Sequence, residues 1–487
     1  MNSMTSLSAE QISETAKRLL EEFHLPGLSV GVVSGNELVY AEGFGWADIS
    51  RRRPQDPILH QRIGSITKTM VCLCALALVD EQRLRLDARV ADLLPDLKFN
   101  GYGDELTLWH LLTHTGGIGE APTSADVADP IRVLWADNPE TPPLAEKYPD
   151  GITIDVRPGS KWHYANHGWM LVGEIIARLE GATIEQVLHR RIFKPLGMHT
   201  TDNLDLPGER LTTGYLHAPS PEALDQLELL GKAPPSGGPI DGHNIPGDWV
   251  YINGRAAGAV QSNIPDMALY AAALLNSGGG IVSPETFKEM LKPHWCPDER
   301  LISIGLAFFR SHQFGEFTFG HNGGVDGGWN TNLTVIPGRN LAMLVHLNAY
   351  LETAEDVYSQ LLQAILDAPT PPLPGTPLDA KVQTSATGVY TFPSGTLTNS
   401  RPIRLHGRLQ ITEEDGELIL RSRRGAWRNG IRLLPVDADD PFFLALDTVS
   451  AVKPKIALIL DSGGQISGLR LDRLTLMERD DTLSPWA

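Results

Sequence analysis

Ser65 and Lys68 lie one helical turn apart at the start of a long apolar segment, RIGSITKTMVCLCALALVDE, residues 62–81. Residues three apart on a helix share a face, with Cβ atoms about 5–6 Å apart, so the lysine amine can reach the serine hydroxyl. Serine is a weak nucleophile until a base takes its proton, and burial of a lysine disfavours its charged form. The spacing therefore predicts Ser65 as a nucleophile with Lys68 as its base.

This spacing is weak when taken alone, because about one Ser-x-x-Lys is expected by chance in a chain of this composition. Ser65 could instead cap the helix, and Lys68 could extend toward solvent. Other nucleophile and cofactor signatures give no competing assignment. Ser65 does not lie in a Gly-x-Ser-x-Gly turn, and neither a dinucleotide-binding glycine pattern after a strand nor a Walker motif is present.

Two downstream segments carry residue types that suit the same chemistry. PGSKWHYANHGWMLVGEIIARLEG (residues 158–181) contains Tyr164-Ala165-Asn166 just before an apolar helical pattern. GHNGGVDGG (residues 320–328) contains His321-Asn322-Gly323. Tyr251 precedes Asn253 with the same spacing as Tyr164 and Asn166, but no apolar helix follows it, so Tyr164 is the better candidate and Tyr251 is left as a residue that could line a cleft.

Five segments, taken in order, resemble the serine β-lactamase and penicillin-binding-protein superfamily over about residues 8–367. They are GSITKT, LLTHTGGI, the Tyr-Ala-Asn segment, IFKPLGMHTT and the His-Asn-Gly segment. The branch they are most similar to contains class C β-lactamases, serine carboxylesterases and D-stereospecific peptidases such as D-aminopeptidases. His321 stands where most β-lactamases and penicillin-binding proteins carry lysine, which argues against β-lactam hydrolysis.

The resemblance implies a role for each motif around the nucleophile. Ser65 is the expected nucleophile, and Lys68 is the expected base, shared with the phenol of Tyr164 because a nearby ammonium favours the phenolate. Which of these two groups takes the proton is left open by the sequence. Asn166 is expected to hold Lys68 or the substrate amide by hydrogen bonding.

The third motif is expected to form the substrate-docking strand. His321 would contribute a hydrogen bond or a proton there, and Gly323 and Gly324 would let the backbone approach the substrate closely. The backbone N–H groups of Ser65 and Gly324 are the expected oxyanion hole. Asp326 could bind a substrate amine, but a role in the turn is the better expectation.

Composition limits the partners. The 487 residues carry a formal net charge of −18, which argues against nucleic acid or an anionic membrane as a main partner. Three cysteines give no disulfide framework and no metal spacing, and no metal or organic cofactor is expected. Without a signal-peptide pattern or a membrane-span pattern, we expect a cytoplasmic protein that acts on a small-molecule ester, amide or short peptide and could be a homo-oligomer.

The expected fold is α+β, with a β-lactamase/transpeptidase-like antiparallel sheet, helices on both faces and a helical subdomain at about residues 70–250. Periodicity predicts helices at 8–23, 65–80, 166–180, 266–276 and 351–367, a hairpin around residues 34–36, and two strands within 321–348 joined by a turn at 337–340. We expect a catalytic domain at 1–367, a Pro-rich linker at 368–384 and an all-β, lipocalin-like barrel at 385–487.

The expected chemistry is hydrolysis of an ester or amide through an acyl-Ser65 intermediate, by a D-stereospecific peptidase or amidase, or by a carboxylesterase. A β-lactamase or an acyltransferase of the same family is an alternative. A catalytically idle β-lactamase-like scaffold that binds a partner is a second alternative, although the presence of Ser65, Lys68 and Tyr164 together argues against it.

Overall fold

The computed structural model describes most of the chain. The ranges are 6–118, 135–136, 140, 142–154, 156–204, 207–218, 238–249, 251–325, 327–351, 353–370, 378, 380–393, 407–423, 425, 427–472, 475–484 and 486. Asp326 and the middle of the predicted linker lie outside these residues. No helix among them combines the length and the apolarity needed to cross a bilayer.

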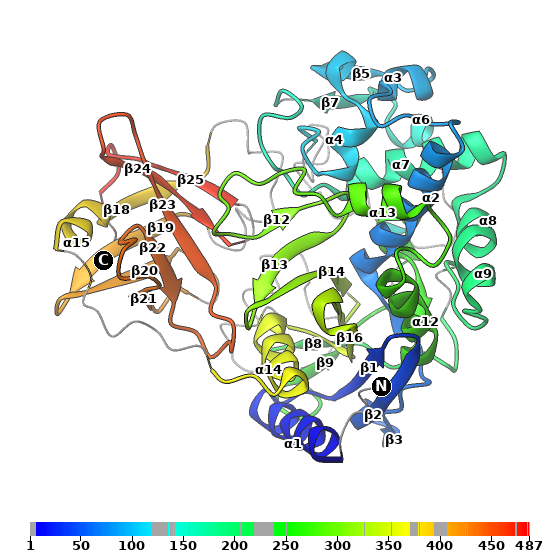
Figure 1. Ribbon diagram of the computed structural model, residues 1–487, viewed down its shortest axis with the longest axis horizontal. Coiled ribbons are helices and arrows are strands. Elements are labelled where there is room, and N and C mark those ends of the chain that lie inside the picture. Colours follow the sequence, from blue (N-terminus) through cyan, green and yellow to red (C-terminus); the bar gives the residue numbers. More distant parts are fainter. Residues whose placement is uncertain are drawn as a thin grey trace.

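A large antiparallel sheet forms the centre of the first part of the chain (Figure 1). The predicted hairpin is confirmed, with Gly35 in a left-handed conformation at its turn. In the described residues the sheet order is β12-β13-β14-β15-β16-β1-β2-β3. The strands are β1 (Gly27–Ser34), β2 (Glu37–Asp48), β3 (Arg53–Pro54), β12 (Ser303–Ile304), β13 (Phe309–Gln313), β14 (Glu316–Val325), β15 (Trp329–Ile336) and β16 (Leu341–Leu347).

One sequence expectation about this sheet is wrong. Residues 321–348 were expected to form two strands, but they contribute to three, because β14 continues through the glycine-rich stretch that ends at Val325. Glycine is unfavourable in strands when local propensity alone is considered. Here tertiary packing overrides that preference, since β14 must pass close to the turn that carries Ser65.

Helices cover both faces of the sheet, as expected for this fold class. The amphipathic helix α1 (Ser6–Glu22) and α14 (Ala354–Leu366) pack on one face, where Ile12 and Leu361 are fully buried. Helices α2 (Thr67–Asp80) and α12 (Ile264–Leu275) pack on the other face. The arrangement confirms the α+β class.

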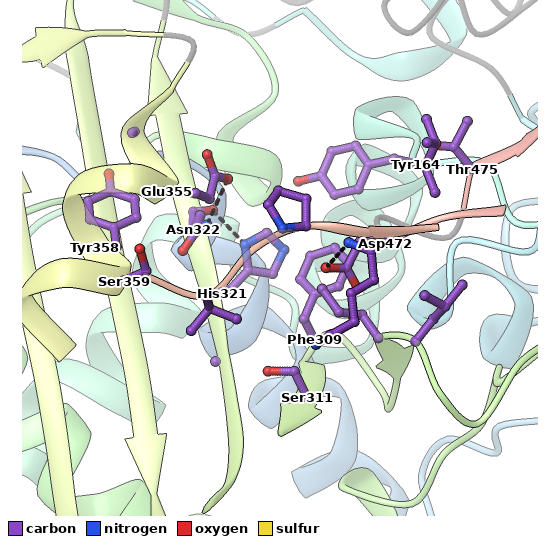
Figure 2. Close-up of a pocket in the computed structure, with 18 of the residues that line it drawn as sticks. Tyr164, Phe309, Ser311, His321, Asn322, Glu355, Tyr358, Ser359, Asp472 and Thr475 are labelled. Atoms are coloured by element: carbon purple, nitrogen blue, oxygen red, sulfur yellow. Dashed lines mark hydrogen bonds between the residues drawn. The ribbon is translucent and has the colours of Figure 1, made fainter. Parts of the chain in front are cut away.

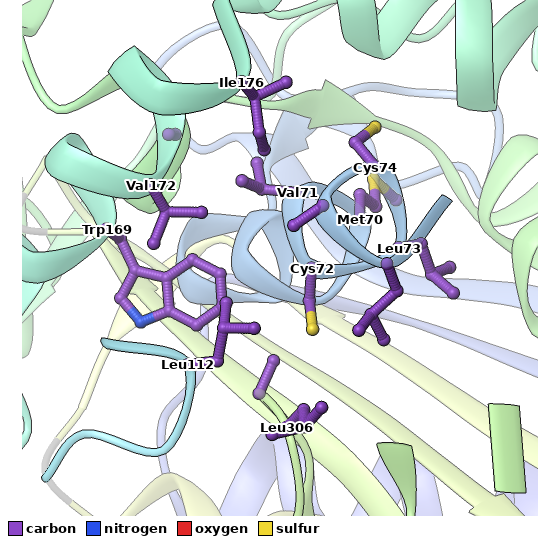
Figure 3. Close-up of a cluster of buried hydrophobic side chains, with 14 of the residues drawn as sticks. Met70, Val71, Cys72, Leu73, Cys74, Leu112, Trp169, Val172, Ile176 and Leu306 are labelled. Atoms are coloured by element: carbon purple, nitrogen blue, oxygen red, sulfur yellow. The ribbon is translucent and has the colours of Figure 1, made fainter. Parts of the chain in front are cut away.

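Helix α2 is buried on all sides, which explains its continuous apolar sequence. Cys72 and Cys74 are free, fully buried residues of its core, and burial raises their pKa values. Figure 3 shows this core, where α2 meets Trp169 and Val172 of α7 (Asn166–Glu180). Helix α7 begins and ends at the predicted residues, and Gly181 closes it in a left-handed conformation.

Smaller elements complete the N-terminal part. They are η1 (Gly64–Ile66), η2 (Gly103–Glu105), η4 (His189–Phe193), η5 (Pro337–Arg339), α3 (Val90–Leu93), α4 (Leu108–Leu112), α6 (Leu144–Lys147), α8 (Ile184–Leu188), α9 (Lys194–Leu196), α11 (Arg255–Gly258), α13 (Pro284–Met290), β4 (Gln61–Arg62), β5 (Phe99–Gly101), β6 (Trp135–Ala136), β7 (Ile152–Ile154), β8 (Tyr215–His217), β9 (Asn244–Pro246), β10 (Tyr251–Ile252), β11 (Gln261–Ser262) and β17 (Ala349–Tyr350).

The C-terminal part is a closed β-barrel, preceded by helix α15 (Ala380–Ala386). Its described strands are β18 (Gly388–Thr391), β19 (Leu409–Glu414), β20 (Glu417–Ser422), β21 (Ile431–Pro435), β22 (Phe443–Leu446), β23 (Lys455–Leu460), β24 (Ile466–Leu471) and β25 (Thr475–Arg479). The barrel has its own apolar core, which includes Leu420, Leu444 and Leu469. The domain boundaries at 367 and 385 stay predictions.

The barrel packs against the catalytic part rather than extending away from it (Figure 1). Phe443 and Ala457 of the barrel form a small apolar cluster with Leu301. Arg300 forms an ion pair with Asp440 at 2.5 Å and lies over the ring of Phe443. These contacts hold the outer face of β22 and β23 against the segment that precedes β12.

Candidate active site

Ser65 lies in η1, the single 3-10 turn that leads into α2, rather than in the α-helix itself. Gly64 before it has φ +55°, and a Cβ placed on Gly64 would lie 2.8 Å from the backbone nitrogen of Gly324. Both the backbone conformation and the close approach of β14 therefore require glycine here. The Ser65 turn thus lies directly against the glycines of the third motif.

The Ser65 hydroxyl lies between the two groups expected to take its proton. Lys68 Nζ is 2.8 Å from Ser65 Oγ, and the Tyr164 hydroxyl is 2.7 Å from the same oxygen. Lys68 Nζ also lies 5.1 Å from the centroid of the Tyr164 ring. Tyr164 lies 99 residues after Ser65 in the sequence, and the fold brings its hydroxyl within hydrogen-bond distance of the serine.

Lys68 does not extend to solvent. The residue is fully buried, and its Nζ also donates to Asn166 Oδ1 at 2.8 Å and to the backbone carbonyl of Ala257 at 2.6 Å. Asn166 thus contacts the lysine, the first of its two predicted roles. The carbonyl of Ala257, in α11, carries no signal in the sequence because any residue type could supply it.

Tyr164 is held in place by a buried histidine. The ring of His114 stacks on the Tyr164 ring, with centroids 4.2 Å apart and planes 20° apart. The backbone N–H of Ala165 donates to His114 Nδ1 at 3.0 Å, and the N–H of His163 donates to the His114 carbonyl at 2.8 Å. Burial, then the charge of Lys68, holds the pKa of His114 well below its usual range. His114 is therefore a neutral support for the tyrosine segment.

His321 presents a defined face to the site. Its Nδ1 lies 2.6 Å from the backbone carbonyl of Asn322, and since a carbonyl can only accept, Nδ1 carries the proton. Burial, then the charge of Lys68, lowers the pKa of His321 to about 3, so the ring is neutral near pH 7. Nε2 consequently carries a lone pair, and no described protein group hydrogen-bonds to it. It is an acceptor for a substrate N–H or O–H.

A polar chain extends from β14 to α14. Asn322 Nδ2 donates to Glu355 Oε1 at 3.2 Å (Figure 2). Asn332 Nδ2 donates to Asn322 Oδ1 at 2.6 Å. Sequence reasoning treated Asn322 only as the middle residue of the third motif and missed Glu355. The position of Asn322 inside that motif was the only sequence signal that could have pointed to this polar chain.

The site opens into a cavity of about 940 Å³. Ser65, Tyr164 and His321 belong to its wall, and so do residues of the barrel, including Asp472 and Thr475 (Figure 2). Gly323 and Gly324 of the third motif also line it, whereas Tyr251 is not among its lining residues. The barrel thus contributes one side of the cleft that contains the nucleophile.

The sequence model of the beta-lactamase family matches residues 12–367. The chain belongs to this family. The match covers all of the residues that the three motifs bring together and ends before the barrel, at the last residue of the expected catalytic domain.

One sequence relative and two solved structures resemble this chain at low sequence identity, and the two structures share its fold. An unguisins hydrolase of Aspergillus campestris is 24% identical over 367 residues, covering 70% of this chain and 61% of that protein. An octameric penicillin-binding protein homologue from Pyrococcus abyssi is 22% identical with a TM-score of 0.61, covering 96% of this chain and 99% of that one. D-amino acid amidase from Ochrobactrum anthropi is 23% identical with a TM-score of 0.60, covering 73% and 99%.

Proposed function

We propose that this protein is a serine hydrolase that cleaves ester or amide bonds through an acyl-Ser65 intermediate. The observation that carries the proposal is the position of Ser65 Oγ, within hydrogen-bond distance of both Lys68 Nζ and the Tyr164 hydroxyl. A nucleophile and its base must be in such contact for proton removal to accompany attack.

In the acylation step, Ser65 Oγ attacks the substrate carbonyl carbon, while its proton passes to the neutral amine of Lys68 or to the phenolate of Tyr164. The tetrahedral intermediate then collapses, and the leaving alcohol or amine takes that proton. Water attacks the acyl-serine by the reverse route and releases the carboxylic acid. The backbone N–H groups of Ser65 and Gly324 are the proposed donors to the oxyanion.

Lys68 can serve this cycle because its surroundings fix its position. Asn166 Oδ1 and the Ala257 carbonyl accept hydrogen bonds from its amine and hold Nζ beside Ser65 Oγ. Both acceptors are uncharged groups, so neither stabilises the ammonium as strongly as a carboxylate would.

For the substrate we propose small esters or amides, including short peptides with a D-residue at the acyl position. The D-amino acid amidase fold and the family membership support this class. The neutral His321 supports it as well, since its Nε2 can accept a hydrogen bond from a substrate amide or amine N–H. Comparison of D- and L-alanine p-nitroanilide tests stereospecificity, and equal rates would contradict the D-specific form of the proposal.

The central test compares wild type with Ser65→Ala on p-nitrophenyl butyrate, followed by intact mass spectrometry of the quenched reaction. We expect hydrolysis that is lost in the variant, and a butyryl adduct on wild type only. Equal rates for the two proteins, with no adduct, would refute the acyl-serine mechanism and favour the partner-binding scaffold.

A further inference from the structure

The outer face of the barrel carries a row of residues toward the active-site cavity. In the barrel register Phe443 pairs with Ala457, Ala457 with Arg470, and Arg470 with Leu476. Successive side chains of a strand point to opposite faces, and the neighbours of Arg470 in β24, Leu469 and Leu471, belong to the barrel core. The Arg470 side chain therefore points outward from the barrel.

This row is anchored at one end and open at the other. Phe443 and Ala457 pack against Leu301 of the catalytic part and are buried. Arg470 and Leu476, further along the row, line the same cavity as Ser65 and His321. The docking of the barrel thus fixes a guanidinium in the wall of the cleft that contains the nucleophile.

Arg470 is partly desolvated, and its surroundings among the described residues show how its charge is balanced. Burial lowers the pKa of Arg470, with Asp298 as the opposing negative charge. The Asp298 carboxylate is already bound by Arg300, with Nε to Oδ1 at 2.9 Å and NH2 to Oδ2 at 2.6 Å. In the part of the chain that the structure describes, no hydrogen bond or ion pair is formed by the Arg470 side chain.

Other charged groups lie along this side of the cavity. Arg300 and Lys455 are further cations, whereas Glu299 and Asp472 carry negative charge. Asp472 Oδ2 accepts a hydrogen bond from the backbone N–H of Lys455 at 3.3 Å. Because Arg300 already engages the carboxylate of Asp298, the half-buried Arg470 remains available to bind an anion, and the planar fork of a guanidinium matches a carboxylate.

We propose that Arg470 binds a carboxylate carried by the substrate, so that the barrel selects among the esters and amides that Ser65 attacks. This inference rests on the proposed function, because its first test measures the hydrolysis of substrates. The carboxylate could belong to the acyl group or to the leaving group, as in a peptide with a free C-terminus, and the two arms of the experiment distinguish these cases.

The experiment compares wild type with Arg470→Gln and Arg470→Lys on matched pairs of substrates. The acyl arm uses mono-p-nitrophenyl glutarate and the uncharged p-nitrophenyl butyrate. The leaving-group arm uses D-Ala-Gly and D-Ala-Gly amide. We expect Arg470→Gln to lower kcat/KM for the carboxylate member of one arm by about 10- to 100-fold, mainly through KM, as expected for loss of a charged hydrogen-bonded pair.

Uncharged substrates supply the internal control. With p-nitrophenyl butyrate and the peptide amide, the kcat/KM of Arg470→Gln should stay within about threefold of the wild-type value. With the carboxylate substrate, Arg470→Lys should recover part of the kcat/KM that Arg470→Gln loses. Arg423→Gln, at an exposed barrel arginine outside the cavity, is the matched control variant and should change neither arm. An equal fall for charged and uncharged substrates would mean that Arg470 only supports barrel docking, and no fall in either arm would also overturn the proposal.

A binding measurement separates this inference from the proposed function. Ser65→Ala should bind mono-p-nitrophenyl glutarate or D-Ala-Gly about 10-fold more tightly than the Ser65→Ala/Arg470→Gln double variant, measured by calorimetric titration. Absence of Ser65-dependent turnover with an intact difference in binding would refute the hydrolase proposal alone. Equal binding by the two variants would refute the role of Arg470 alone.

Discussion

Gly323→Ala tests whether the position of the Ser65 turn depends on the close approach of β14. A Cβ on Gly323 would lie 2.0 Å from the backbone carbonyl oxygen of Ile63 and 2.2 Å from Thr331 Oγ1. Because real contacts of this kind essentially never fall below 3.0 Å, the strand and the turn must separate by about 1 Å. Ile63 cannot yield easily, since its carbonyl accepts from Thr331 at 2.9 Å and its N–H donates to Val260 at 2.9 Å.

The expected effect follows from that displacement. A shift of about 1 Å in a catalytic group can lower the rate about 100-fold. Overpacking typically costs about 1–3 kcal/mol of stability, less than the usual 5–15 kcal/mol total, so most Gly323→Ala molecules should remain folded. We therefore expect kcat/KM on p-nitrophenyl butyrate to fall about 100-fold, with a urea midpoint only modestly lowered.

The matched control is Gly208→Ala, because a Cβ on Gly208 would meet nothing within 4 Å. Its activity and urea midpoint should match wild type. If Gly323→Ala kept wild-type kcat/KM and an unchanged midpoint, the close packing of β14 on η1 would not govern the position of Ser65, and the reasoning would be refuted.

Two further predictions concern the proton path and pH. Tyr164→Phe keeps the ring that stacks on His114 but removes the hydroxyl beside Ser65 Oγ. We therefore expect kcat to fall about 10²–10⁴-fold with little change in the urea midpoint. A fall in kcat of less than threefold would exclude the phenol from proton transfer. Stability should decrease from pH 7 to pH 5 by a few kcal/mol, at about 1.4 kcal/mol per pKa unit. The reason is that unfolded imidazoles bind protons below about pH 6.5, whereas the buried imidazoles of the folded protein, among them His114, His163, His321 and His346, resist protonation until the pH falls toward their folded pKa values. Urea midpoints at the two pH values measure this, and an unchanged or higher midpoint at pH 5 would contradict it. Burial lowers these folded pKa values to about 4 for His163 and about 3 for His321 and His346.

The sequence predicted those helices and strands whose apolar periodicity and end residues are sufficient to define them. Helix α7 was predicted residue for residue, since its apolar periodicity is regular and Gly181 provides a left-handed end. Prediction failed where packing overrides propensity, as in the glycine-rich end of β14. Strand β21 of the barrel is likewise hard to predict from the sequence, because its five residues end at Pro435 and show little alternation.

For the candidate site, the sequence supplied the residues that motifs name but not those that only the fold brings near. The three motifs led to Ser65, Lys68 and Tyr164, whose mutual contacts are now visible although their roles stay proposals. The Ala257 carbonyl and the barrel residue Arg470 belong to none of these motifs. Arg470 reaches the cavity only because Phe443 and its neighbours dock the barrel on residues near 300, a long-range contact that alternation within single strands cannot reveal.

Charge within the cavity gives the third motif and the barrel different tasks. Burial, then the charge of Lys68, lowers the pKa of His321, so the motif strand presents a neutral acceptor. A substrate carboxylate placed at His321 Nε2 would face a lone pair and be repelled. The same carboxylate placed at Arg470 would find a cation without displacing Lys68 from Ser65, Asn166 or Ala257. An anionic substrate would therefore bind with its carboxylate toward the barrel and its N–H groups toward β14, which leaves the lysine free for proton transfer.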